Sequence, residues 1–388
     1  MESKISDMER ITSQMNDIYG RVNIPLHEPT FTNKEVDYVT DCVKSGWVSS
    51  VGKYVTKFEE DLANYVGVKR AVAVVNGTAA LHIALKICGV QKNDEVLMPA
   101  LTFVATANAV SYLQATPHFV DVSYDTLGVD ANKLATYLKQ QTVMKDGHCY
   151  NKQTGRVIRA IVPMHTFGHA VDIDALQKVC DAYHIVMVED AAESLGTSYK
   201  GKMTGSFGKA SAVSFNGNKI ITTGGGGAIL TDDEALADYA KHLTTTAKLP
   251  HPWSYEHDEI AYNYRMPNLN AALGCGQLEK MPTFLAQKKE LTKRYQKLFK
   301  GMEGVELFTQ PAHSDSNYWL QTLILDPTLY KRNQVLQELN DNGVMARPIW
   351  TPMHELKPYG ACPKMDLSVT EDLKKRIINI PSSPVEVK

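Results

Sequence analysis

Short apolar runs alternate with helical patterns along most of the chain. An apolar run at residues 71–75 is followed by Asn76-Gly-Thr78 and by a helical pattern from Ala79 to Cys88 that ends at Gly89. Strands that alternate in this way with helices are typical of crossover units around a mostly parallel sheet, so the chain is predicted to be an α/β protein. Further apolar runs cover residues 95–98, 118–122, 158–164 and 185–188, and helical patterns cover residues 105–113 and 173–183.

The alternation changes after residue 209. Two strand candidates, residues 210–215 and 228–231, flank a link at residues 216–227. This link is too short for a crossover helix, so the two strands are predicted to form a hairpin-like pair.

The last third of the chain has a different organisation. A long helical pattern from Leu269 to Phe299, interrupted near Pro282, is interpreted as a bridge between two lobes. We therefore predict an N-terminal helical segment (1–45), a large domain (46–275) and a small C-terminal α+β domain with the bridging helix (276–388). The small domain is expected to contain strands at 318–325 and 343–347 and helices at 329–340 and 370–378.

The N-terminal segment has amphipathic spacing. Ile5, Met8, Ile11, Met15 and Ile18 recur at helical intervals among charged residues. The segment lacks the continuous apolar stretch of a signal peptide or a membrane anchor. We expect its apolar face to pack on the protein's own body or on a partner subunit rather than on a membrane surface.

The charge balance and the cysteine content limit the kinds of molecule that the protein is expected to bind. Lys and Arg total 41 against 43 Asp and Glu, so the formal charge of -2 provides no field that would gather nucleic acid or an anionic membrane. Any phosphate group must then be bound by local geometry. The six cysteines include no CxxC pair, which favours reduced thiols in a cytoplasmic enzyme over a disulfide framework or a metal site.

Candidate chemistry follows the predicted strands, because ligands of open α/β sheets bind beyond the carboxyl ends of the strands. Gly77 and Thr78 open a helix, where free backbone N–H groups favour a phosphate, although the same residues also make a good structural cap. Phe103 could stack on a flat heterocycle or belong to the core. Asp190 could face a protonated ring nitrogen, cap a helix or bind a metal.

Lys219 lies in a Gly- and Thr-rich turn, five residues after Ser214. A lysine near a phosphate site can attack an aldehyde and form a Schiff base, and the Ser214 hydroxyl can bind the same phosphate. The glycines follow Lys219 instead of preceding it, so the turn is no P-loop and ATP binding is disfavoured.

These motifs together resemble the DegT/DnrJ/EryC1/StrS family of nucleotide-sugar aminotransferases, which depend on pyridoxal 5'-phosphate (PLP). The resemblance implies a fold-type I transferase with a mostly parallel sheet of the seven-stranded type in its large domain. It covers nearly the whole chain and is carried by residues 76–81, 99–103, 189–194, 214–219, 222–227 and 262–266.

The resemblance also implies roles for individual residues. Lys219 becomes the catalytic Schiff-base lysine, and Asp190 the partner of the pyridine nitrogen. The remaining expected cofactor contacts are Gly77, Thr78, Ala79, Phe103, Glu193, Ser214 and Asn263, and the expected substrate contacts are Arg265, Trp350 and His354.

Two of these implied roles have wider consequences. Asn263 matches a residue that reaches the phosphate from the other subunit, so a homodimer with shared active sites is expected. Glu193 stands where many relatives have Gln or His beside the cofactor's phenolic oxygen, and two acceptors cannot share a hydrogen bond unless one carries a proton.

The resemblance extends to the LegC group through residues 24–29, 46–50, 244–253 and 362–368. It implies that glutamate donates an amino group to C4 of a UDP-linked 2-acetamido-4-keto-2,6-dideoxy hexose. The alternative acceptor is GDP-linked 4-keto-6-deoxymannose, which would make the enzyme a GDP-perosamine synthase.

Two other classes of function fit the sequence less well. A non-catalytic regulator with a PLP fold would be expected to lack Lys219 or Asp190, or to carry a DNA-binding module. A nicotinamide-dependent oxidoreductase would need GxGxxG after its first strand, and the glycines of this chain lie elsewhere.

Overall fold

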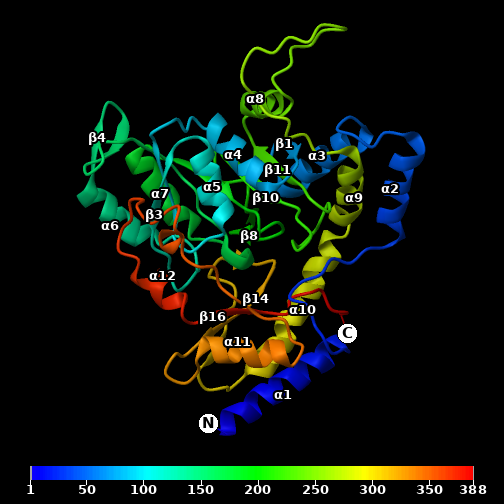
Figure 1. Cartoon of the computed structure of the whole chain (residues 1–388), viewed down its shortest axis with the longest axis vertical. Coiled ribbons are helices and arrows are strands. Elements are labelled where there is room, and N and C mark those ends of the chain that lie inside the picture. Colours follow the sequence, from blue (N-terminus) through cyan, green and yellow to red (C-terminus); the bar gives the residue numbers. More distant parts are fainter. Residues whose placement is uncertain (1, 388) are drawn as a thin grey trace.

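A computed structural model describes residues 2–387, with side chains from residue 9 onward. Its largest sheet confirms the predicted α/β class and contains β1 (Arg70–Val74), β2 (Glu95–Pro99), β3 (Thr116–Val120), β6 (Ile158–Ile161), β7 (Val186–Asp190), β10 (Ala210–Ser214) and β11 (Gly227–Thr231). The strand order is β1-β11-β10-β7-β6-β2-β3 (Figure 1). Strand β11 is antiparallel to both neighbours, and the other pairs are parallel, so the predicted hairpin-like pair is confirmed.

Helices cover both faces of this sheet because its strands are apolar on both sides. In β1, Val72 and Val74 pack with one group of helices, whereas Ala71 and Ala73 pack with another. The first group is α4 (Gly77–Ile87), α5 (Val104–Tyr112) and α8 (Glu234–Thr244); the second includes α3 (Lys53–Val66) and α9 (Asn268–Leu278). Helices α6 (Ala131–Gln141) and α7 (Ile173–Tyr183) share a further core cluster around β3, β6 and β7.

A second sheet lies in the C-terminal part of the chain. Its strands are β12 (Val305–Leu307), β14 (Gln321–Leu325), β15 (Arg347–Pro348) and β16 (Ile377–Ile380), in the order β12-β14-β16-β15. Helices α10 (Met281–Phe299), α11 (Arg332–Asp341) and α12 (Ser368–Leu373) belong to the same part of the chain.

Two predictions for this part of the chain were wrong. The expected helix at 370–378 ends at Leu373, and Ile377–Ile380 is a strand between two others, because a buried apolar run has no period that separates helix from strand. The expected strand at 343–347 is reduced to β15, where Pro348 cannot donate a ladder hydrogen bond.

The N-terminal helix α1 (Glu2–Tyr19) packs on the protein's own body, as one of the two preferred interpretations had it. Ile11 and Met15 are buried in a cluster with α10, α11 and the second sheet, while the side chains of Ile5 and Met8 lie outside the described residues. Helix α2 (Asn33–Ser45) instead packs on α9. The predicted division between residues 275 and 276 falls inside α9 and stays a prediction.

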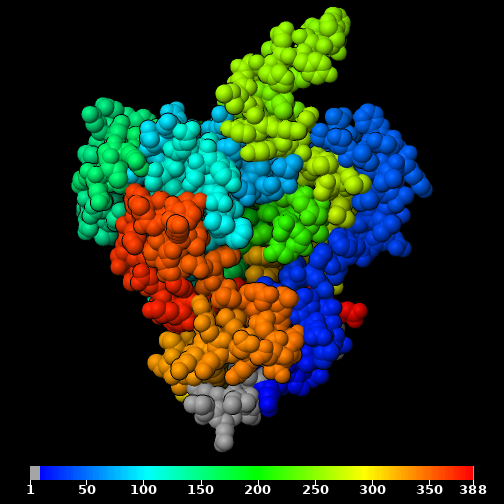
Figure 2. Space-filling model, in the orientation of Figure 1, coloured from blue at the N-terminus to red at the C-terminus, as the bar shows by residue number. Residues whose placement is uncertain are grey.

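Residues 245–265 form an arm that leaves the body after α8 and projects far beyond it (Figures 1 and 2). Its two branches are joined by antiparallel bridges at Thr245–Asn263 and Lys248–His257. Shorter pieces elsewhere are β4 (Thr142–Lys145), β5 (His148–Asn151), β8 (Ser198–Tyr199), β9 (Lys202–Met203), β13 (Ser314–Asp315), η1 (Thr166–Gly168) and η2 (Met353–Glu355). Within residues 2–387, every helix is too short or too polar to cross a membrane.

Candidate active site

A cavity of about 440 Å³ opens at the carboxyl ends of β1, β2, β7 and β10. Its walls come from segments far apart in sequence, which the parallel topology brings to one edge of the sheet. Predicted site residues in the lining are Gly77, Thr78, Phe103, Asp190, Glu193, Ser214, Lys219 and Trp350, and the other lining residues are Asn76, Leu81, Ala105, Met164, Ala192, Asn216, Asn218 and Trp319.

The start of α4 forms one end of this cavity. Asn76 caps the helix, its side chain accepting a hydrogen bond from the Ala79 amide at 2.8 Å. A Cβ atom on Gly77 would lie 2.8 Å from the Cβ of Ser214, so only glycine allows the two segments to approach this closely. The first amides of a helix have no intrahelical acceptor, and Gly77 and Thr78 both line the cavity.

Asp190 is the last residue of β7 and is buried in the wall of the cavity. Its carboxylate accepts hydrogen bonds from the Thr106 hydroxyl at 2.7 Å and from the Ala192 amide at 3.2 Å. Burial raises the pKa of Asp190, and these two hydrogen bonds counter only part of that effect. A protonated heterocyclic nitrogen in the cavity would supply the missing positive charge and stabilise the carboxylate.

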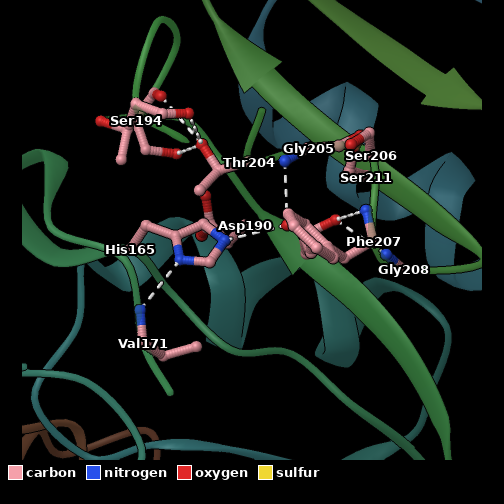
Figure 3. A network of polar contacts seen from close by, with 12 residues as sticks. His165, Val171, Asp190, Ser194, Thr204, Gly205, Ser206, Phe207, Gly208 and Ser211 are labelled. Atoms are coloured by element: carbon pink, nitrogen blue, oxygen red, sulfur yellow. Dashed lines mark hydrogen bonds and ion pairs between the residues drawn. The ribbon is translucent and has the colours of Figure 1, made fainter. Parts of the chain in front are cut away.

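The residue before Asp190 anchors the strand from its other face. The buried Glu189 carboxylate accepts backbone hydrogen bonds from Gly205, Phe207 and Gly208 at 2.6–2.8 Å. His165 Nε2 lies 3.0 Å from the same carboxylate. His165 Nδ1 accepts a hydrogen bond from the Val171 amide at 3.3 Å (Figure 3). Burial would raise the pKa of Glu189, but the bonds from His165 and the backbone hold it below its usual value.

Lys219 reaches into the cavity between an acid and an aromatic ring. Its Nζ lies 3.4 Å from Glu193 Oε1 and 4.0 Å from the centre of the Trp319 ring, and the side chain is only 13% exposed. The Trp319 indole N–H donates to the Asn218 carbonyl at 2.7 Å, one residue before Lys219. The ring and the turn are therefore held as one unit.

Glu193 is buried beside this lysine. Burial raises the pKa of Glu193 to about 7, although the charge of Lys219 acts in the opposite direction. Its second oxygen accepts the Phe167 amide at 2.8 Å, in the turn η1 where Phe167 has a left-handed φ of 55°. Near neutral pH the carboxyl group is thus partly protonated, so Glu193 can supply the proton that one of the two acceptors in the predicted contact must carry.

Trp319 is a lining residue that the sequence did not reveal. It precedes β14 and looked like part of a core strand, since an aromatic residue beside an apolar run gives no signal of exposure to a cavity. Asn317 fixes its position: the Asn317 side chain accepts the Trp319 amide at 2.8 Å and donates to the carbonyls of Glu193 and Leu195 at 2.9 Å.

Four predicted site residues lie outside the lining. The Ala79 amide is already engaged by Asn76. Asn263 is exposed at the base of the arm, where its Oδ1 accepts a hydrogen bond from Arg265 Nε at 3.1 Å. His354 lies in η2, and its Nε2 is 3.6 Å from Glu371. The roles expected for these four residues stay predictions, as do the roles expected for the residues that line the cavity.

Comparison with known proteins places this geometry in context. The model of the DegT/DnrJ/EryC1/StrS aminotransferase family matches residues 29–385. EpsN of Bacillus subtilis, named as a pyridoxal phosphate-dependent aminotransferase, is 38% identical over 92% of this chain and 90% of its own length. GDP-perosamine synthase of Escherichia coli O157:H7 is 36% identical over 93% of both chains. The PLP-form of Spr1654 from Streptococcus pneumoniae superposes with a TM-score of 0.83 at 25% identity, covering 94% and 95% of the two chains.

Proposed function

Since the chain belongs to the DegT/DnrJ/EryC1/StrS family of sugar aminotransferases and uses PLP, we propose that it aminates C4 of a GDP-linked 4-keto-6-deoxy sugar with glutamate as donor. The similarity to GDP-perosamine synthases of Escherichia coli, Caulobacter vibrioides and Vibrio cholerae, at 34–36% identity, supports this acceptor. It favours the GDP alternative over the UDP-linked acetamido sugar of the LegC interpretation, and membership of the LegC group stays a prediction.

The cavity fits PLP in both shape and charge. The Gly77–Ser214 approach leaves room for a phosphate at the start of α4, and the buried Asp190 suits a protonated pyridine nitrogen. Phe103, which is half exposed, lines the same cavity. When bound, PLP supplies an aldehyde for amines and a ring that withdraws electrons from the reacting carbon.

Lys219 is the residue that we propose holds the cofactor and moves protons. Its amine is the only lysine nitrogen among the residues that line the cavity. Once an incoming amino group takes its place, the freed Lys219 amine can remove a proton from the donor's α-carbon and return one to the acceptor. The single observation that carries the proposal is the convergence of Lys219, Asp190 and the start of α4 on one cavity.

A homodimer in the cytoplasm completes the proposal. Asn263 is exposed and outside its own chain's cavity, so a second copy could receive it as the family resemblance implies. The arm supports pairing because Trp253 and Tyr255 are each 80% exposed and Ile260 is 89% exposed. Apolar side chains in this number along one projecting segment are typical of a protein interface.

The test compares Lys219→Ala with Lys92→Ala, an exposed lysine outside the cavity. With PLP, glutamate and GDP-4-keto-6-deoxymannose, wild type and Lys92→Ala should produce 2-oxoglutarate and a GDP-amino sugar that mass spectrometry identifies. Lys219→Ala should lose at least about 10³-fold in rate.

The same assay with a panel of UDP-linked keto sugars identifies the acceptor. Turnover with a UDP-linked acetamido sugar alone would overturn the GDP-linked acceptor, while the proposed transaminase activity would still stand. Substantial turnover by Lys219→Ala would overturn the catalytic role of Lys219.

A further inference from the structure

The base of the arm is fixed to the body by a cluster of aromatic side chains. His82, in the middle of α4, is buried, and its ring packs edge-on against Tyr262 at 4.8 Å and against Tyr264 at 6.0 Å between ring centres. The two tyrosine rings stack on each other at 5.0 Å. The Tyr264 hydroxyl lies 3.4 Å from His82 Nδ1, and Tyr112 closes the cluster at 5.6 Å from the His82 ring.

The backbone of the same segment is held on two sides. The amides of Tyr262 and Tyr264 donate to the carbonyls of Leu243 and Thr244 at the end of α8, at 2.9 and 3.0 Å. The Tyr264 carbonyl accepts the Val75 amide at 2.9 Å, where the segment adds to the edge of β1. Residues 262–265 are therefore extended and cannot slide along the body without breaking these bonds.

An extended segment alternates its side chains between two faces. Tyr262 and Tyr264 point to His82, so Asn263 and Arg265 share the opposite face, where Asn263 is exposed and bonded to Arg265. The direction in which Asn263 is presented thus depends on how the two tyrosines sit on His82. The His82 ring suits this packing because burial, and next the charge of Lys86, lower its pKa to about 4, which leaves it uncharged.

Helix α4 therefore contacts both the cavity and the base of the arm. Its first turn borders the cavity of its own chain, and His82, one turn further, holds the strand of Asn263. We propose that His82 is a positioning residue for the neighbouring subunit's active site, acting through Tyr262 and Tyr264 on Asn263. This inference rests on the shared active site of the proposed function.

Mixed dimers separate an effect on the partner's site from an effect on the chain's own site. In both pairings below only one pocket contains Lys219, so the absorbance of lysine-bound PLP and the rate of PLP loss report on that pocket alone. The first pairing joins a His82→Ala subunit with a Lys219→Ala subunit. The second pairing joins a wild-type subunit with a subunit that carries both substitutions.

If His82 acts on the neighbouring site, the first pairing should match a wild-type/Lys219→Ala dimer, because its intact pocket receives Asn263 from a chain with His82. The second pairing should hold PLP about tenfold more weakly, as expected for one lost hydrogen bond to a charged group. The reverse pattern, or equal loss in both pairings, would overturn the inference.

Further variants control for misfolding and for effects unrelated to the arm. His82→Gln, which retains a polar side chain of similar size, replaces His82→Ala if the smaller residue prevents folding, and Tyr264→Phe tests the hydroxyl alone. His118→Gln, at a buried histidine bonded to Glu95 and remote from the arm in the chain, should show no difference between pairings.

Asn263→Ala in the same two pairings tests the shared site itself. If Asn263→Ala weakens PLP binding only in the second pairing, the shared active site is supported. If the His82 variant then leaves PLP binding unchanged in both pairings, only the positioning role of His82 is overturned. If Asn263→Ala shows no such asymmetry, the shared site and the inference both fail, while the transaminase activity of Lys219 stands.

Discussion

At the scale of single residues, this protein keeps several ionisable groups buried where their protonation differs from that of the unfolded chain. Glu193, Asp190 and Lys288 are all buried, and each has a hydrogen-bond partner. Burial disfavours the charged form, so each group links folding to pH in a direction that its charge determines.

Glu193 should make the cofactor-free protein less stable as pH rises. Its folded-state pKa of about 7 lies above the ordinary 4.5, so between these values the folded chain binds more protons than the unfolded chain. Relative to Glu193→Gln, wild type should lose up to about 3 kcal/mol of unfolding free energy from pH 4.5 to 7.5. Urea titrations of both proteins at several pH values measure the difference, and parallel pH profiles would contradict a raised pKa.

Lys288 should show the opposite slope. Its fully buried amine donates to the Trp319 carbonyl at 2.9 Å and to the Ser382 carbonyl, and burial holds its pKa well below 10.5. The unfolded chain therefore binds more protons, and wild type should gain up to about 1.4 kcal/mol per pH unit relative to Lys288→Met between pH 8 and 9.5. A constant difference between the two proteins across this range would show that Lys288 stays charged when folded.

At the scale of elements, tight turns join the second sheet to the cavity. Gly168 has φ of +96°, and a Cβ atom there would lie 1.9 Å from Asn317 Oδ1. Because Asn317 fixes Trp319 and binds the carbonyls of Glu193 and Leu195, a shift of Asn317 reaches the wall that faces Lys219.

Gly168→Ala should cost at least about 3 kcal/mol, since a left-handed alanine alone costs roughly 1–2 kcal/mol and Asn317 must also move. Gly89→Ala is the matched control, because Gly89 has φ of +91° with open space around it, and it should cost about 1 kcal/mol. Thermal unfolding of both variants measures this. Equal losses would show that Asn317 moves aside freely.

The sequence predicted those helices and strands whose own residues show a clear hydrophobic pattern. The hairpin-like pair β10–β11 and the helices α4, α5 and α7 follow from their own residues. Strand β16 does not, because Ile377–Ile380 is apolar throughout and becomes a strand only between β14 and β15. Trp319 was missed for a similar reason. Its place in the cavity depends on Asn317, which belongs to no recognisable motif, and on η1, which lies far from it in sequence.

At the scale of the whole molecule, the arm is the feature least explained by one chain. Figure 2 shows it standing clear of the body. Its aromatic residues Trp253 and Tyr255 are largely exposed. Long apolar side chains held this way are unfavourable in a lone subunit.

The double variant Trp253→Ser/Tyr255→Ser should therefore weaken pairing without unfolding the subunit. Loss of two buried aromatic anchors is worth roughly 4 kcal/mol, or about 10³-fold in the dimer dissociation constant. Sedimentation at several concentrations measures the constant, with Val143→Ser on β4 as an exposed control. An unchanged dissociation constant would show that these side chains are not part of the dimer interface.

The strand order of the second sheet also has a consequence for synthesis of the chain. Strand β16 is an interior strand, paired with β14 and β15, although both precede it in sequence. Helix α1 packs on the core that this sheet helps to build. A ribosome therefore translates α1 long before it translates the strand that completes this core, and α1 can complete its packing only after residue 380 has been synthesised.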